Sequence, residues 1–112
     1  MDVIIQSLGF TAKPQLEAFI REKANKLALI SDQIIRVDVT LYEAPKNETG
    51  GCICEARVEV PGNDPFVKKH AATYEQAIDE VFDTLLEVLR RNKEKNEDRY
   101  RRAGAGGADE AQ

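Results

Sequence analysis

The sequence predicts an α+β domain in which a four-stranded sheet carries two helices on one of its faces. Two segments in the middle of the chain alternate apolar and polar residues with a period of two, which is typical of half-buried strands. Two other segments place apolar residues at the i, i+3, i+4 spacing of an amphipathic helix. The 112 residues, 42% of them hydrophobic, suffice for one small domain. The element order that results is β-α-β-β-β-α. A double-stranded-RNA-binding domain shares part of this topology.

The first strand and the first helix come from the first thirty residues. Residues 3–7 read as a short strand. Thr11 and Pro14 then mark a helix start, Thr11 by capping and Pro14 because its ring presets φ. We expect a helix over residues 14–30, whose apolar positions share one face. These positions are Leu16, Phe19, Ile20, Ala24 and Leu27.

The two alternating segments are residues 35–42 and 52–60. The apolar positions are Ile35, Val37, Val39 and Leu41 in the first and Cys52, Cys54, Ala56, Val58 and Val60 in the second. Each strand therefore has one apolar side, so both helices are expected to cover a single face of an antiparallel-rich sheet. Between the strands lies the loop EAPKNETGG, rich in turn-forming residues.

A last strand and a long helix complete the domain. Residues 66–71 have the length of a strand, but FVKKHA does not alternate cleanly and its facing stays open. Thr73 and Gln76 form a Thr-x-x-Gln capping box. The helix that follows has an apolar stripe that stops at Leu89, so we expect the helix to outrun the sheet. The stripe consists of Tyr74, Ala77, Ile78, Val81, Leu85, Val88 and Leu89.

Positive charge is concentrated where this helix leaves the sheet. Residues 90–102 hold seven Lys or Arg and three Asp or Glu, whereas residues 1–89 hold nine and 15, and the whole chain has a net charge of −4. Affinity for a polyphosphate follows local contacts, so this separation predicts a polyanionic partner. The small, acidic AGAGGADEAQ is expected to be disordered. We divide the chain into a domain, residues 1–97, and a basic, then Gly/Ala/acidic flexible tail, residues 98–112.

Other chemistry is thinly represented. No apolar run approaches the ~20 residues of a membrane span, and the N-terminus lacks the pattern of a signal peptide, which favours the cytoplasm. Cys52 and Cys54 lie two apart on one strand, where we expect buried core thiols rather than a metal half-site. His70, the one histidine, has no evident nucleophile as a partner. We expect no catalytic residues, no metal, no cofactor and no small-molecule substrate, hence no enzyme.

Four segments carry a resemblance to a known family: the strand VDVTL, the helix text EKANKL, the AID that ends at Asp79 with Asp83 four residues on, and LRRNKEK. In this order and spacing they resemble the bacterial ribosome hibernation-promoting and ribosome-associated inhibitor proteins, once called sigma-54 modulation proteins, in their short form. The resemblance covers residues 1 to about 97.

The resemblance implies a plug that binds the small ribosomal subunit near the decoding centre, blocks mRNA and tRNA binding, and inhibits translation under stress or in stationary phase. Off the ribosome it implies a monomer. The residues that match the family's basic positions are expected to contact rRNA; they are Lys23, Lys26, Arg90, Arg91, Lys93 and Lys95. For Lys23 the alternative is that its stem covers the core while its charge reaches solvent.

Thr84 and Glu87 stand where the family pattern has basic residues, and Glu87 reverses the charge. This predicts either a footprint shifted toward the helix end or a different ribosomal surface. The chain ends soon after the helix, so we do not expect it to pair ribosomes by itself. Its acidic tail could interfere with pairing, reach the mRNA channel or have no role. The alternative function is a protein-binding, transcription-modulating regulator that uses an acidic sheet face.

Overall fold

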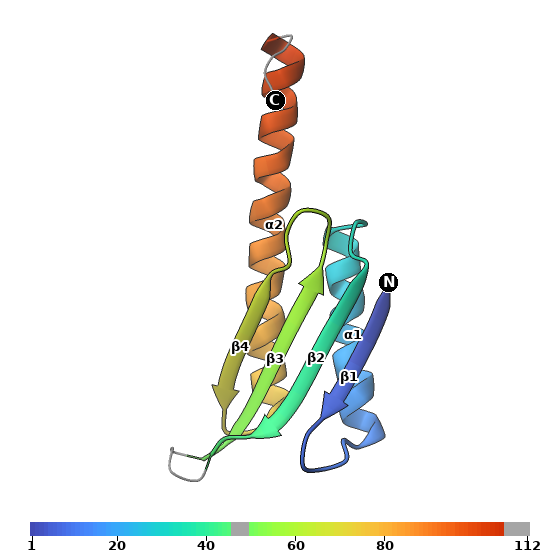
Figure 1. Cartoon of the computed structure of the whole chain (residues 1–112), viewed down its shortest axis with the longest axis vertical. Helices are drawn as coiled ribbons and strands as arrows, with labels where there is room; N and C mark the ends of the chain where they lie inside the picture. Colours follow the sequence, from blue (N-terminus) through green and yellow to red (C-terminus); the bar gives the residue numbers. More distant parts are fainter. Residues whose placement is uncertain (46–49, 107–112) are drawn as a thin grey trace.

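The element order predicted from the sequence is confirmed by the computed structural model, which describes residues 1–45 and 50–106, with side chains described as far as residue 93 (Figure 1). The elements are β1 (Asp2–Ser7), α1 (Pro14–Ile30), β2 (Arg36–Glu43), β3 (Cys52–Glu59), β4 (Phe66–Ala71) and α2 (Tyr74–Gly106).

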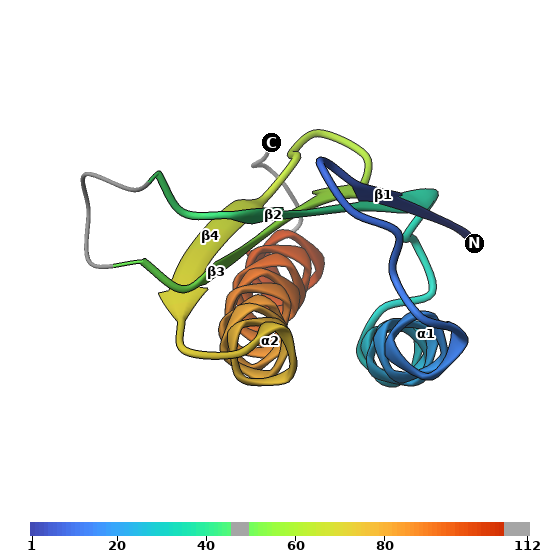
Figure 2. The ribbon, with the colours of Figure 1, turned by 90° about the horizontal axis from the view of Figure 1, so that it is seen from below.

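The four strands lie side by side in sequence order, β1-β2-β3-β4. Strand β1 is parallel to β2 because α1 carries the chain back across the sheet, whereas β2–β3 and β3–β4 are antiparallel neighbours. Seen from below, both helices lie under the same face of the sheet (Figure 2). The predicted two-layer arrangement is confirmed, and the second face of the sheet, the open face, has no covering element among residues 1–45 and 50–106 (Figure 2).

The core lies between the sheet and the two helices. From α1 it receives Ile20, Ala24 and Leu27, all fully buried. From α2 it receives the predicted stripe except Val88, which is not part of the core, and in addition Phe82, which is 1% exposed and which the predicted stripe omitted. Helix α2 has a wide apolar face because it contacts β3, β4 and α1 together.

Two predictions about strand facing are wrong. Ile35 is 52% exposed and precedes β2, whereas its neighbour Ile34 is buried. Cys52 is only half-buried, because it lies at the end of β3 where the core thins, and its Sγ is 3.7 Å from the carbonyl oxygen of Ala72. Cys54 is buried as expected, and burial raises the pKa of its thiol to about 12.

The helix starts agree with the predictions in part. Pro14 occupies the first turn of α1, but the N-cap is Lys13 and makes no side-chain capping bond, so the capping role expected of Thr11 is wrong. At α2 the Thr73 hydroxyl oxygen accepts a hydrogen bond from the Gln76 amide at 3.1 Å, which confirms that half of the predicted capping box.

Helix α2 has 33 residues and rises well beyond the end of the sheet (Figure 1). It passes the predicted domain boundary at residue 97 and includes residues 103–106, which were expected to be disordered. Extending an existing helix requires no new nucleation, so a helix can continue into a segment that would not start one. Residues 107–112 lie outside the described part of the chain. No helix in the described part is long and apolar enough to cross a membrane.

Candidate nucleic-acid interface

On the open face of the sheet, residues of opposite charge lie opposite one another on neighbouring strands. In the strand register every charged residue of this face is opposite a residue of the other sign: Asp2 with Arg36, Arg36 with Glu59, Asp38 with Arg57, and Glu55 with Lys68. Four carboxylates thus meet three cations. The sheet face predicted to be acidic therefore has an excess of one carboxylate, because its other charges are balanced by residues of opposite sign on neighbouring strands.

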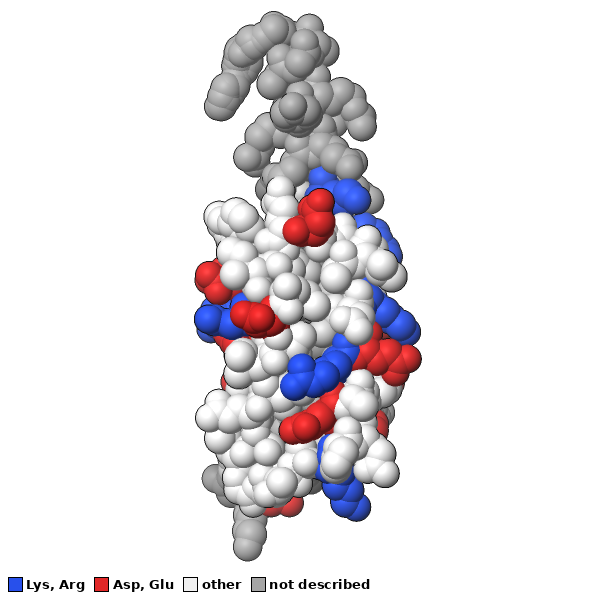
Figure 3. All heavy atoms as spheres, turned by 90° about the vertical axis from the view of Figure 1, so that its right-hand side faces the viewer, with Lys and Arg blue, Asp and Glu red and all other residues white. Residues whose placement is uncertain are grey.

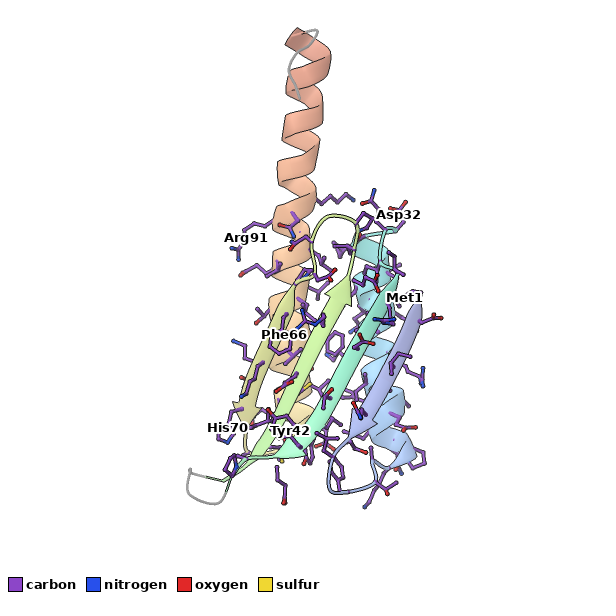
Figure 4. All side chains as sticks on the ribbon, viewed as in Figure 1. Met1, Asp32, Tyr42, Phe66, His70 and Arg91 are labelled. Carbon is purple, nitrogen blue, oxygen red and sulfur yellow. The ribbon has the colours of Figure 1, made fainter. Side chains whose placement is uncertain are left out.

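The polar aromatic and imidazole groups of this face serve the fold (Figure 4). The Tyr42 hydroxyl donates a hydrogen bond to Glu55, and this bond raises the pKa of the phenol. The His70 ring is hydrogen-bonded to the carbonyl oxygen of Gly50 and ties the β2–β3 loop to β4. Gly51 beside it has φ +101°, and a Cβ there would lie 2.7 Å from the Ala71 carbonyl oxygen, so the loop needs glycine at this close approach.

The helix side of the domain is different, because charges of both signs meet in the seam between α1 and α2. The Lys23 ammonium lies 2.5 Å from Asp79 Oδ1 and 5.2 Å from the centroid of the Phe19 ring. Its side chain is 19% exposed. The hydrogen bond to Asp79 raises the pKa of Lys23, so the group stays charged and paired. Lys23 thus neither lies free at the surface nor merely reaches past the core to solvent.

Lys26 lies about one turn further along α1 and is exposed. The part of α2 beside α1 supplies no cation to this region: residues 74–89 contain five acids and no Lys or Arg. These acids are Glu75, Asp79, Glu80, Asp83 and Glu87. The cations next to the seam therefore come from α1, up to the point where α2 leaves the sheet.

The cations at the end of α2 divide between two flanks of the helix. Arg90 follows Asp79 by eleven residues and Lys93 follows it by fourteen, about three and four turns, so both lie on the flank that Asp79 turns toward α1. Arg91 is rotated by about 100° from Arg90 and lies on the flank turned away from α1 (Figure 4). There its guanidinium pairs with Glu87 at 2.8 Å, and both side chains are about two-thirds exposed.

The structure therefore brings together four of the six predicted contact residues along the α1-facing side; these are Lys23, Lys26, Arg90 and Lys93. It separates Arg91 from them, and the side chain of Lys95 lies outside the described residues. In Figure 3, blue groups run up the molecule to the base of the α2 overhang, with red groups interspersed along the whole length. The sequence prediction missed Asp79 as the partner of Lys23, although both stand in segments that carry the family resemblance.

No group of three or more His, Cys, Asp or Glu side chains in the described part of the chain is arranged to hold a metal ion. The fold is a small α+β domain in which Arg90, Arg91 and Lys93 are exposed near the point where α2 projects beyond the sheet (Figure 1). Residues 3–97 match the model of the family described as sigma 54 modulation protein / S30EA ribosomal protein. The chain belongs to this family, as the resemblance predicted.

Two solved structures share the fold. One is a ribosomal subunit interface protein from Coxiella burnetii, 18% identical, with a TM-score of 0.73 over 83% of this chain and 98% of that one. The other is the N-terminal domain of Protein Y from Thermus thermophilus, 22% identical, with a TM-score of 0.72 over 81% of this chain and 98% of that one. Comparison with curated proteins gave no match. The family consists of ribosome-associated modulation factors and is not known as an enzyme family.

Proposed function

We propose that this protein is a ribosome hibernation factor that binds the small ribosomal subunit near the decoding centre. There it blocks mRNA and tRNA binding by occupying their space, and it inhibits translation in the cytoplasm under stress or in stationary phase. It acts as a monomer off the ribosome and without a cofactor. Family membership supports ribosome association, and the placement of the exposed cations supports contact with rRNA phosphates.

The observation that carries this proposal is the contrast between the two sides of the domain. The open face matches its charges internally, strand against strand. On the helix side Lys26, Arg90 and Lys93 are exposed, and no ion pair engages any of them among the described side chains. Exposed cations gain from phosphate because they release their loosely held counterions and those of the phosphate. The helix side is thus the side suited to a polyanion.

The spacing of these cations favours an extended ligand over a single phosphate. Lys26 lies three residues beyond Lys23, whereas Arg90 lies eleven residues beyond its partner Asp79. Because α1 and α2 rise in the same direction (Figure 1), Lys26 and Arg90 are separated by roughly 12 Å along the helices. One phosphate cannot bridge that distance, whereas an RNA backbone lying along the overhang can contact both.

We propose Lys26, Arg90 and Lys93 as direct phosphate contacts. Lys95 follows Arg91 by four residues, about one helical turn, and therefore belongs to the flank of Arg91. Arg91 contributes from the flank of α2 that is turned away from α1, where it also forms an ion pair with Glu87. Lys23 belongs to the same surface through its pair with Asp79. This footprint lies nearer the helix end than the family pattern implies, because the acidic first half of α2 repels phosphate.

Co-sedimentation with purified small and large ribosomal subunits, at 0.05 and 0.2 M salt, tests the proposal. We expect near-stoichiometric binding to the small subunit, competition by tRNA and mRNA, and a steep loss of affinity with salt. The variant Lys26→Glu/Arg90→Glu/Lys93→Glu should lose binding while keeping its far-ultraviolet circular dichroism. Lys68→Glu, a charge reversal on the open face, serves as the control. Unchanged binding of the triple variant would overturn the assigned surface.

A further inference from the structure

Lys23 differs from Lys26, Arg90 and Lys93 because its charge is engaged by a carboxylate among the described side chains. Its ammonium is 2.5 Å from Asp79 Oδ1 across the helix seam, while the ammonium also lies over the Phe19 ring. The carboxylate is the more exposed partner, at 48% against 19% for the lysine side chain. The pair therefore joins the two helices that carry Lys26 and Arg90, and the lysine is the inner member.

The surroundings of this pair are acidic. Asp83 and Glu22 both act on Lys23 electrostatically, together with Asp79. If Lys23 were neutral, the Asp79 carboxylate would be left without its partner, one turn from Asp83 on the same flank of α2. Two uncompensated carboxylates would then face any phosphate that approaches Lys26, and exposed charges act over about 10 Å at ordinary salt.

We propose that Lys23 is a positioning residue that acts through Asp79 and does not itself contact phosphate. It neutralises the carboxylate at the inner end of the interface, and it fixes α1 against α2 so that Lys26 and Arg90 face the same ligand. This inference rests on the proposed function, since it assigns a role within the ribosome-binding surface.

A rescue experiment separates positioning from direct contact. Affinity and its salt dependence are measured for wild type, Lys23→Met, Lys23→Met/Asp79→Asn and Lys26→Met. Methionine keeps an unbranched stem over Phe19 while removing the charge. The probes are small ribosomal subunits and a 30-nucleotide single-stranded RNA. The control Lys23→Met/Asp38→Asn has the net charge of the rescue variant but removes its carboxylate from the open face. Circular dichroism and thermal unfolding establish that each variant is folded.

If Lys23 is a positioning residue, Lys23→Met weakens binding about three- to fivefold at 0.1 M salt, because the negative charge of Asp79 is then no longer neutralised. The Asp79→Asn change then restores affinity to within about twofold of wild type, whereas Asp38→Asn does not. Because no contact is lost, the slope of log affinity against log salt in the rescue variant Lys23→Met/Asp79→Asn stays at its wild-type value. Lys26→Met, which removes a contact, lowers that slope by about 0.7 on single-stranded RNA.

The opposite pattern overturns the proposal: a rescue variant as weak as Lys23→Met, with a slope lower by about 0.7, makes Lys23 a direct contact. Wild type that binds RNA but not the small subunit refutes the ribosomal function, while the RNA comparison still decides the role of Lys23. Wild type that binds neither probe refutes both, because the surface is then not built for a polyanion.

Discussion

Replacing Glu87 by Gln should strengthen RNA binding while slightly destabilising the fold. Glu87 holds the Arg91 guanidinium at 2.8 Å, one turn away on α2, and both groups are about two-thirds exposed. An exposed i, i+4 ion pair stabilises a helix by about 0.3–0.5 kcal/mol, and that is the expected loss in the free energy of unfolding. The same substitution removes a negative charge from the interface and releases Arg91.

The gain in affinity follows from counting contacts. One additional phosphate contact steepens the slope of log affinity against log salt by about 0.7 on single-stranded RNA, which corresponds to about fourfold tighter binding at 0.15 M salt. Binding and stability should thus move in opposite directions. A variant that acted through the fold alone would move both in the same direction.

The assay is a titration of small subunits and of single-stranded RNA at four salt concentrations, with urea denaturation of the same variants. Glu80→Gln is the matched control, because Glu80 precedes Glu87 by two helical turns on the same face and has the same charge. If Glu87→Gln and Glu80→Gln raise affinity equally with unchanged slopes, Arg91 has not gained a phosphate. The ligand then does not reach the flank of α2 turned away from α1, and the reasoning fails.

Three further predictions concern the fold. Phe82→Ala should cost about 3–5 kcal/mol in urea denaturation because the ring is 1% exposed, whereas Leu29→Ala, at a position 84% exposed, should stay within about 0.5 kcal/mol. Thr73→Ala removes the cap of α2 and should cost about 1 kcal/mol in the same measurement. Burial, followed by the charge of Glu55, raises the pKa of Cys54 from 9.0 to about 12 in the folded state. The folded protein therefore holds this proton to higher pH than the unfolded chain. Stability should be intact below pH 9 and fall by up to about 1.4 kcal/mol per pH unit from there toward pH 12, and Cys54→Ala should lack this component in urea denaturation at pH 8 and 10.5.

The elements of the fold could be predicted because each depends on the periodicity of its own segment. The bounds predicted for α1 agree with the structure, since Pro14 starts the helix and the apolar spacing continues to its end. The facing of β4 could not be predicted, because the register with β3 sets it. That register turns Val67, Lys69 and Ala71 to the helix side, and the position of Lys69 on an edge strand lets a charged residue alternate with apolar ones.

The sequence predicted which helices carry the candidate site, but it could not predict which contacts their side chains make. Sequence spacing assigns Arg90 and Arg91 to different flanks of α2, yet it cannot say which flank faces α1. The pair between Lys23 and Asp79 depends on how α1 and α2 pack side by side, and the periodicity of either helix alone leaves that open. A resemblance based on basic positions likewise includes Lys23 without showing that its charge is already paired.

The division of α2 into an acidic and a basic part explains how a chain of net charge −4 can meet a polyanion in one orientation. The open face, whose opposite charges lie on neighbouring strands, produces a weak electrostatic field, so it neither attracts a charged partner nor orients it. The five acids of residues 74–89 repel phosphate along the sheet-covering turns, whereas Arg90 and Lys93 attract it where the helix stands free. Approach with the overhang first is then the favoured encounter. Replacing those acids by neutral residues should therefore broaden the range of orientations in which the protein binds, while the contacts of Arg90 and Lys93 stay the same. Cross-linking from positions along α2 measures this range.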